Sequence, residues 1–154
     1  MKWFQLRVQN RIIGTNIILK NMRLRDNDLC SFCIQEKESI EHLFFDCNYT
    51  TNFWQTLSNC LRNMTLLEEN FIFEKDFILL GCSQNKSISK VLYYVILVAK
   101  YYVYKCRCEG SLPNLFCFRN YLHDKYCVEK YISMKNLTLD KFNEDWQGWE
   151  YFVS

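Results

Sequence analysis

The sequence predicts a mostly α-helical protein that folds as one compact domain of 154 residues. It contains 4 Gly and 1 Pro, too few for the frequent turns of an all-β sandwich. A hydrophobic fraction of 49% and an aromatic fraction of 17% supply a packed core and exclude a disordered chain. We expect one domain over residues 1–154: a basic helical arm (1–29), a small Cys- and His-bearing lobe (30–47) and a helical body (48–154).

The arm begins with a predicted helix from Lys2 to Ile13, in which basic and apolar residues alternate. Trp3, Leu6, Ile12 and Ile13 are near helical spacing and are expected to form its apolar face. The basic residues of this segment fall largely elsewhere on the helix. This arrangement predicts an amphipathic helix.

A second short helix is predicted from Asn16 to Met22, because Gly14 interrupts the first helix and Thr15 can cap the next. Residues 23–29 then form a polar loop. Residues 1–29 carry six basic and two acidic side chains, a net charge of +4, whereas the whole chain carries +2. The positive charge is therefore concentrated in the arm.

The body is predicted to contain long helices joined by short loops. The apolar run from Val91 to Val103 is shorter than the ~20 residues of a membrane span and contains Lys100, so we expect a buried core helix. The apolar piece at 70–81 fits more than one kind of element. The predicted helices run from just before His42 to Met64, from Ser87 or Ser89 to Cys108, from Leu115 to Met134, and from Leu139 to Trp149.

Four potential metal ligands lie within 18 residues, in the pattern Cys30-x2-Cys33-x8-His42-x4-Cys47. Thiolate and imidazole groups are the ligands that tetrahedral Zn²⁺ prefers in proteins. All four positions are filled by the protein, so no coordination site is left for a catalytic water, and we expect one structural zinc. The alternative is a set of ordinary core cysteines with a hydrogen-bonded histidine.

Cysteine usage indicates a reducing compartment. The chain has nine Cys, an odd number, and its first residues contain no apolar segment typical of a secretory signal. We therefore expect free or metal-bound thiols and an intracellular location, in the cytoplasm, the nucleus or both.

The zinc motif and its flanks resemble the zinc-binding region that follows the reverse transcriptase in LINE-type (non-LTR) retrotransposons. The later stretches 97–114 and 129–136 resemble the tail of the same open reading frames. The residues that carry the resemblance in the first third are Trp3, Arg11, Ile12, Gly14, Thr15, Asn16, Cys30, Ser31, Phe32, Cys33, Glu38, Glu41, His42, Leu43, Phe44, Cys47, Phe53 and Trp54.

The resemblance implies that Cys30, Cys33, His42 and Cys47 bind zinc and that the module binds RNA or DNA during target-primed reverse transcription. It also implies contact with the reverse transcriptase portion of the same polyprotein. The spacer before His42 is eight residues, whereas a retroviral zinc knuckle has four, so knuckle-style base recognition does not follow. Since the chain starts at Met1 without polymerase sequence, we expect either a polyprotein fragment or a separate protein.

The sequence offers no enzyme motif. It contains no Asp-Asp pair of a polymerase, and its single proline, Pro113, precedes Asn114 and not the Asp of a restriction-like nuclease. No phosphate-binding loop or nucleophile elbow occurs, and no small-molecule substrate is expected. We interpret His123 with Cys117 or Cys127 as ordinary helix residues. A second metal site from Cys106, Cys108, Cys117 and His123 is likewise disfavoured.

Two groups of basic residues are candidates for phosphate contacts. For each group the alternative is a solvated helix face. Tyr101, Tyr102 and Tyr104 are expected in the core and not as base-stacking groups. The first group is Lys2, Arg7, Arg11, Lys20, Arg23 and Arg25, and the second is Lys100, Lys105 and Arg107, with Arg119 on the following helix. The spacing allows Lys100, Arg107 and, less well, Arg119 to share an exposed edge.

The leading hypothesis is therefore a zinc-stabilised module that binds RNA, DNA or both. The alternative is a zinc-stabilised interaction module that docks on a polymerase or another protein without touching nucleic acid. Neither hypothesis involves a membrane. A salt-sensitive affinity for nucleic acid would favour the first, and a large exposed aromatic face would favour the second.

Overall fold

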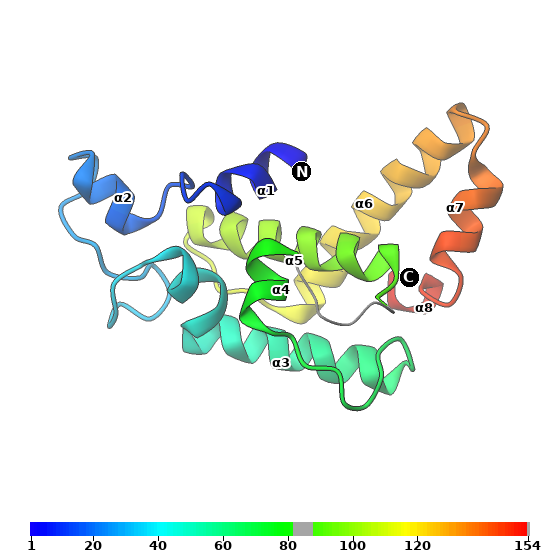
Figure 1. Cartoon of the computed structure of the whole chain (residues 1–154), viewed down its shortest axis with the longest axis horizontal. Coiled ribbons are helices and arrows are strands. Elements are labelled where there is room, and N and C mark those ends of the chain that lie inside the picture. The colour runs from blue at the N-terminus through cyan, green and yellow to red at the C-terminus, as the bar shows by residue number, and fades with distance from the viewer. Residues whose placement is uncertain (82–87, 154) are drawn as a thin grey trace.

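The computed structural model describes residues 1–81 and 88–153 and consists of helices arranged around a central one, α5 (Lys90–Glu109) (Figure 1). No β-strand occurs in these two ranges, although Leu29 and Lys37 form an isolated antiparallel bridge. The prediction of a mostly α fold is confirmed. The other elements are α1 (Lys2–Gln9), α2 (Asn16–Asn21), the π-helical turn η1 (His42–Asp46), α3 (Asn48–Asn63), α4 (Lys75–Leu80), α6 (Leu115–Lys135), α7 (Leu139–Trp146) and α8 (Glu150–Val153).

The remaining elements surround α5 (Figure 1). Helix α3 lies along one side of α5. Helices α1 and α4 contact each other, and α4 also packs against α5. Helix α2 and the loops before η1 occupy one end of the molecule, whereas α6 and α7 form an antiparallel pair that extends from the other end. Helix α2 therefore lies far from α7 and the far half of α6.

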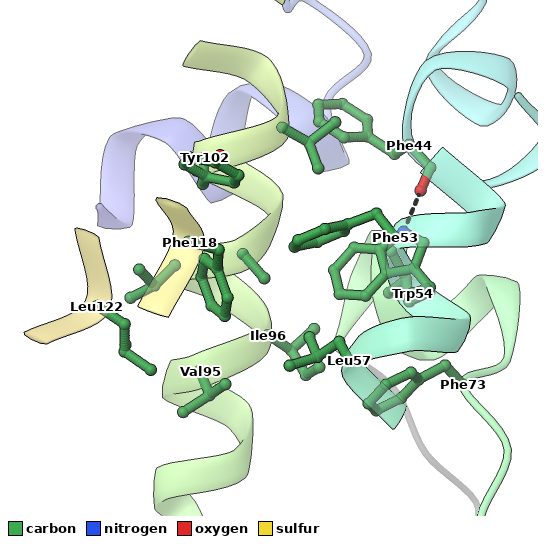
Figure 2. Packing of buried hydrophobic residues seen from close by; sticks show 14 of the residues in the cluster. Phe44, Phe53, Trp54, Leu57, Phe73, Val95, Ile96, Tyr102, Phe118 and Leu122 are labelled. Atoms are coloured by element: carbon green, nitrogen blue, oxygen red, sulfur yellow. Dashed lines mark hydrogen bonds between the residues drawn. The ribbon is translucent and has the colours of Figure 1, made fainter. Parts of the chain in front are cut away.

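The core between α3, α5 and α6 is rich in aromatic rings (Figure 2). The ring of Phe53 meets that of Phe118 edge-on, with centroids 5.6 Å apart. The indole Nε1 of Trp54 donates a hydrogen bond to the carbonyl oxygen of Phe44 at 2.7 Å, which ties α3 to the turn that carries His42. Trp54, Leu57 and Leu61 recur at helical spacing, which explains why this face of α3 is buried.

Local sequence signals set the ends of the long helices. The hydroxyl of Ser89 accepts a hydrogen bond from the Leu92 amide, and Gly110, at φ +70°, ends α5. Ser89 is thus the predicted cap, while Ser87 lies outside the described residues. Asn114 caps α6 by accepting from the amides of Phe116 and Cys117. Among the described residues, no helix is long and apolar enough to cross a membrane.

The predicted apolar face of the first helix is wrong. Helix α1 ends at Gln9 and buries Phe4 and Val8, whereas Trp3 and Leu6 are exposed. Phe4 packs edge-on against Tyr101 of α5, at 5.1 Å between centroids, and this contact selects the face. Ile12 also lies in solvent, and only Ile13 of the predicted set is buried. Helix α1 has two apolar stripes, and its contact with α5 determines that the stripe with Phe4 and Val8 is the buried one.

Three other helix boundaries differ from expectation. The helix predicted across His42 to Met64 is broken at Cys47, whose backbone is extended at ψ 131°. The side chain of Thr15 makes no capping hydrogen bond to α2. The final helix is divided near Gly148, at φ +85°, into α7 and α8. The ambiguous segment 70–81 contains α4, which ends at Gly81 in the left-handed region.

Cys60 and Cys82 have no His nearby in the sequence and are predicted to be core thiols. Cys60 is half-buried and packs against the hydrophobic cluster, in agreement with a core thiol. Cys82, for which the same role is predicted, lies outside the described residues.

Lys100 is buried inside the core and not on the exposed edge that the sequence suggested. Its side chain is 2% exposed, and its Nζ donates to the carbonyl oxygens of Ile78 and Leu79 at 2.8 and 3.0 Å and to Gln5 Oε1. Lys100 therefore links the C-terminal end of α4 to α1. Burial lowers the pKa of Lys100 from 10.5 to about 8.

This pKa predicts a pH dependence of stability. Because the folded pKa lies below the unfolded one, the unfolded chain binds more protons between pH 8 and 10.5, and stability should rise with pH. We expect wild type to gain about 2 kcal/mol relative to Lys100→Met between pH 7.5 and 9.5. Urea unfolding of both proteins at several pH values measures this difference. A pH-independent difference would show that Lys100 keeps its ordinary pKa.

Candidate metal centre

The four predicted ligands converge on one point. The ligand atoms of Cys30, Cys33, His42 and Cys47 all lie within 4.8 Å of one another. The sulfur atoms of Cys30 and Cys47 are 3.8 Å apart, and Cys33 Sγ lies 3.4 Å from His42 Nε2. Cys30, His42 and Cys47 are buried, and Cys33 is half-buried. The side chains form a closed cluster at the surface of the body.

The spacing of these atoms suits a tetrahedral zinc ion. Bonds of ~2.3 Å to sulfur and ~2.1 Å to nitrogen place neighbouring ligand atoms about 3.8 Å apart for two sulfurs and about 3.6 Å apart for sulfur and nitrogen. The cluster matches both values closely. Three thiolates and one imidazole would hold the ion, and no ligand position remains for water. Such a site stabilises the fold and performs no Lewis-acid chemistry.

A tight turn brings Cys30 and Cys33 together. The Ile34 amide donates to the Cys30 carbonyl at 3.0 Å, and the Phe32 amide donates to Cys30 Sγ at 3.4 Å. Ile34 has φ +57°, a left-handed conformation that is strained for a β-branched residue. The Cys30 amide also bonds to the Glu36 carbonyl at 2.7 Å. The turn is therefore held by backbone bonds on both sides of Cys33.

The π-helical turn η1 brings His42 and Cys47 together. In an α-helix, residues five apart point about 140° away from each other. The wider turn reduces that angle, and the Cys47 amide closes it by donating to the His42 carbonyl at 2.8 Å. Cys47 then leaves the helical conformation, so its sulfur faces Cys30. The break in the predicted helix is thus what completes the ligand set.

The two buried thiols differ in acidity when no cation is present. A hydrogen bond with Cys47, together with burial, raises the pKa of Cys30. The same hydrogen bond lowers the pKa of Cys47, whose thiolate accepts it. Zinc binding must therefore displace protons from the cluster, and a cation supplies the charge that allows three thiolates to sit together.

A buried ion pair fixes the lobe to the rest of the fold. Glu38 Oε1 lies 2.8 Å from Nη2 of Arg107 on α5 and accepts from its Nε at 3.0 Å. The same oxygen accepts from the Asn16 amide at 2.9 Å, and Oε2 accepts from the Ser31 amide at 2.7 Å. Arg107 Nη2 also donates to Asn16 Oδ1 at 2.6 Å. One carboxylate thus joins α2, the Cys30 turn and α5.

The electrostatics of this pair favour the charged form of Arg107. Burial by itself lowers the pKa of the guanidinium, but attraction to Glu38 and the hydrogen bonds between them raise it by more. Both carboxylate oxygens are fully buried and hydrogen-bonded. A buried pair with satisfied partners is stable, whereas removal of one partner leaves an uncompensated charge.

Arg107 is therefore not available to phosphate, and its assignment to the nucleic-acid surface is wrong. It is 8% exposed, and its guanidinium faces Glu38 and not solvent. Lys105, another member of that group, is exposed and pairs with Glu109 at 3.6 Å. The predicted cations of the arm are all exposed: Lys2, Arg7, Arg11, Lys20, Arg23 and Arg25.

The remaining Cys and His candidates do not form a second metal centre within residues 1–81 and 88–153. Cys127 Sγ lies 3.4 Å from His123 Nε2, one helical turn away on α6, as their spacing predicted. The His123 Nδ1 bonds to the Val153 carbonyl at 2.6 Å. His123 thus fastens α8 to α6.

The sequence analysis missed the roles of Glu38 and Arg107. A signal for Arg107 was present, because Lys100, Val103 and Arg107 lie at i, i+3 and i+7 of an apolar helix and so share its buried face. Glu38 gave no such signal, since it stands in a polar loop. Phe44 and Trp54, which carry part of the family resemblance, are both buried and join the lobe to α3.

Zinc content tests the ligand assignment. We expect about one zinc per chain in wild type and in Cys117→Ser, an exposed control on α6, and loss of zinc in Cys47→Ser. Elemental mass spectrometry of protein purified without chelator measures this content. A chelator should also lower the melting temperature of wild type and of the control. Wild-type protein without zinc would contradict the assignment.

The buried ion pair predicts a large stability difference between two similar variants. Arg107→Met leaves the Glu38 charge buried without a partner and should cost about 3–5 kcal/mol. Lys90→Met removes an exposed cation that lies 3.9 Å from Asp145 and should cost under about 1 kcal/mol. Denaturant unfolding compares the two. Equal losses would show that the Arg107 pair does not secure the lobe.

Comparison with known proteins supports the metal centre. Residues 1–54 match a family model described as zinc-binding in reverse transcriptase, and this range includes all four ligands. None of the curated proteins compared with the chain matches it. The matched range also contains Asn16 and Glu38 of the buried network. The chain thus carries a structural zinc site, and residues 1–54 are similar to a zinc-binding domain associated with reverse transcriptase.

Proposed function

We propose that the chain is a nucleic-acid-binding zinc module of a LINE-type reverse transcriptase open reading frame. In this proposal the module engages template RNA or target DNA during target-primed reverse transcription. The zinc domain and its reverse transcriptase association support the general assignment. The LINE-type assignment rests on the sequence resemblance, which extends into the tail of the chain.

The observation that carries the proposal is a set of exposed cations without acidic partners in the arm. Lys2, Arg7, Arg23 and Arg25 are exposed, and none forms an ion pair with a carboxylate of the described residues. Unpaired Lys and Arg side chains on one segment are suited to phosphate contacts, because binding releases the counterions of the nucleic acid.

The zinc lobe holds this arm in place. Arg11 forms an ion pair with Glu41, next to the ligand His42. Lys20 lies 3.4 Å from Asp28, which also lies 3.5 Å from Lys37 of the lobe. The Arg11–Glu41 and Asp28–Lys37 pairs therefore tether the arm to the lobe, Lys20 pairs within the arm, and the unpaired cations remain free to bind. Zinc therefore has an indirect role in this proposal, because it stabilises the lobe that holds the arm and its cations in place.

The proposal assigns no catalytic step to this chain. The sequence holds neither the paired aspartates of a polymerase nor the Pro-Asp of a restriction-like nuclease. The reverse transcriptase portion of the parent polyprotein would supply the chemistry and is the expected protein partner.

A docking module is the second candidate, and the far half of α6 favours it. Val128, Tyr131 and Ile132 are exposed there at helical spacing, and Leu137, just beyond the helix, is 93% exposed. An apolar strip of this kind is typical of a protein contact. The two candidates are compatible, because the far half of α6 and helix α2 of the arm lie at opposite ends of the molecule (Figure 1).

Salt-dependent binding tests the nucleic-acid proposal. Wild type should bind a labelled oligonucleotide with an affinity that falls as salt rises, and Arg23→Ala/Arg25→Ala should reduce the log–log slope by about 1.5. Fluorescence anisotropy at four salt concentrations measures the slope.

Lys130→Ala/Lys135→Ala is the matched control, since it removes the same charge from α6 and should change the slope little. Equal effects of the two double variants would contradict a specific role of the arm. Absence of binding at low salt would contradict the proposal and leave the docking candidate.

A further inference from the structure

We propose that the groove between α1 and α5 binds a single-stranded segment of nucleic acid, with a base stacked on Trp3 and phosphates on Arg7 and Lys105. This inference rests on the proposed function and adds to it the strand form and the site. The phosphate contacts proposed for Arg23 and Arg25 do not require a single strand, and they lie outside this groove.

The groove has a volume of about 570 Å³ and combines aromatic with basic side chains. Trp3 and Arg7 contribute from α1, and Tyr101, Tyr104 and Lys105 contribute from α5. Two regions far apart in sequence therefore build it together. The combination of stacking surfaces and cations is what single-strand sites use.

Trp3 is the residue that most requires an explanation. Its side chain is 77% exposed, whereas Trp54, Trp146 and Trp149 are all buried. An indole in solvent adds nothing to core packing and offers a flat ring for stacking. Its neighbour Phe4 supplies the packing of α1, so Trp3 is free for another use.

The wall opposite Trp3 is held firmly. Phe4 packs against both Tyr101, at 5.1 Å, and Tyr104, at 5.8 Å between centroids. The Tyr104 hydroxyl donates to the Gly14 carbonyl at 3.4 Å, and the buried Arg107 guanidinium lies 5.7 Å from the Tyr104 ring. The tyrosines are half-buried, so each presents part of its ring to the groove. A rigid wall reduces the entropy lost on binding.

The charges of the groove favour an anion. Arg7 has no acidic partner among the described residues, and Lys105 reaches the groove from the other side. Glu109 also lines the groove and pairs with Lys105 at 3.6 Å. That pair is exposed and weak, so a phosphate can compete for the ammonium.

Base stacking on Trp3 requires an unpaired base. In a duplex the base faces are stacked on one another and only their edges reach the grooves, so an indole at the protein surface cannot contact them. A single strand can turn a base outward and place it on an aromatic ring. The exposed ring therefore favours single strands, while cations alone bind both forms.

The test uses the full zinc-loaded chain with two 12-nucleotide single strands, oligo-dT and oligo-U, and a 12-base-pair DNA duplex. Trp3 also serves as the reporter, because a base stacked on the exposed indole should quench its fluorescence. We expect wild type to bind at least one single strand more tightly than the duplex, with quenching.

Trp3→Ala should weaken single-strand binding roughly tenfold and abolish the quenching, and Trp3→Phe should restore much of the affinity. Phe116→Ala removes a comparably exposed ring, 72% exposed, from α6 and should change binding less than twofold. Arg7→Gln should weaken binding several-fold.

Two results would overturn the inference while leaving the proposed function intact. One is equal affinity for single strands and duplex; the other is unchanged single-strand binding in Trp3→Ala while Arg23→Ala/Arg25→Ala weakens it. Failure of wild type to bind any of the three probes at low salt would overturn both.

Discussion

The buried contact between Glu38 and Arg107 joins three segments, α2, the Cys30 turn and α5. The lobe around the metal is only 18 residues long. Zinc can close it, but zinc does not determine how the closed lobe sits on the body. The carboxylate of Glu38 does so, because it binds the arm through Asn16, the Cys30 turn through Ser31 and the central helix through Arg107.

Helix α5 is the element on which these constraints meet. Most of its surface is buried. Two of its cations are buried against specific partners: Lys100 against the end of α4, and Arg107 against Glu38. A buried cation is destabilising unless a matching acceptor is present, so these two residues select how α4 and the lobe dock. Only Lys105 among the basic residues of the second predicted group faces solvent. The charge of α5 thus serves folding more than binding.

The proposed nucleic-acid surface is consequently built from the arm and from one edge of α5. The burial of Phe4 turns Trp3 outward, and the same contact brings Tyr101 and Tyr104 to the opposite wall. The Arg11–Glu41 and Asp28–Lys37 ion pairs hold the arm on the lobe, and the arm cations without partners among the described residues extend into solvent. The zinc site and the buried ion pair therefore hold the arm in place, and the arm forms one wall of the groove. Loss of the metal would disturb the groove without any direct contact to it.

The sequence by itself determined the features that depend on residues close to one another in the chain. The spacing of Cys30, Cys33, His42 and Cys47 defined the zinc ligands because metal coordination tolerates few residue types, and caps such as Ser89 and Asn114 set where helices begin. Only the tertiary structure decided which stripe of α1 is buried and which cations are free. Arg107 finds its partner 69 residues away and Lys100 bonds to Gln5 across 95 residues, so local spacing could place both on the buried face of α5 but could not identify their partners. The physical reason is that local rules fix backbone conformation and ligand chemistry, whereas burial of a charge or a ring depends on partners that folding brings from elsewhere.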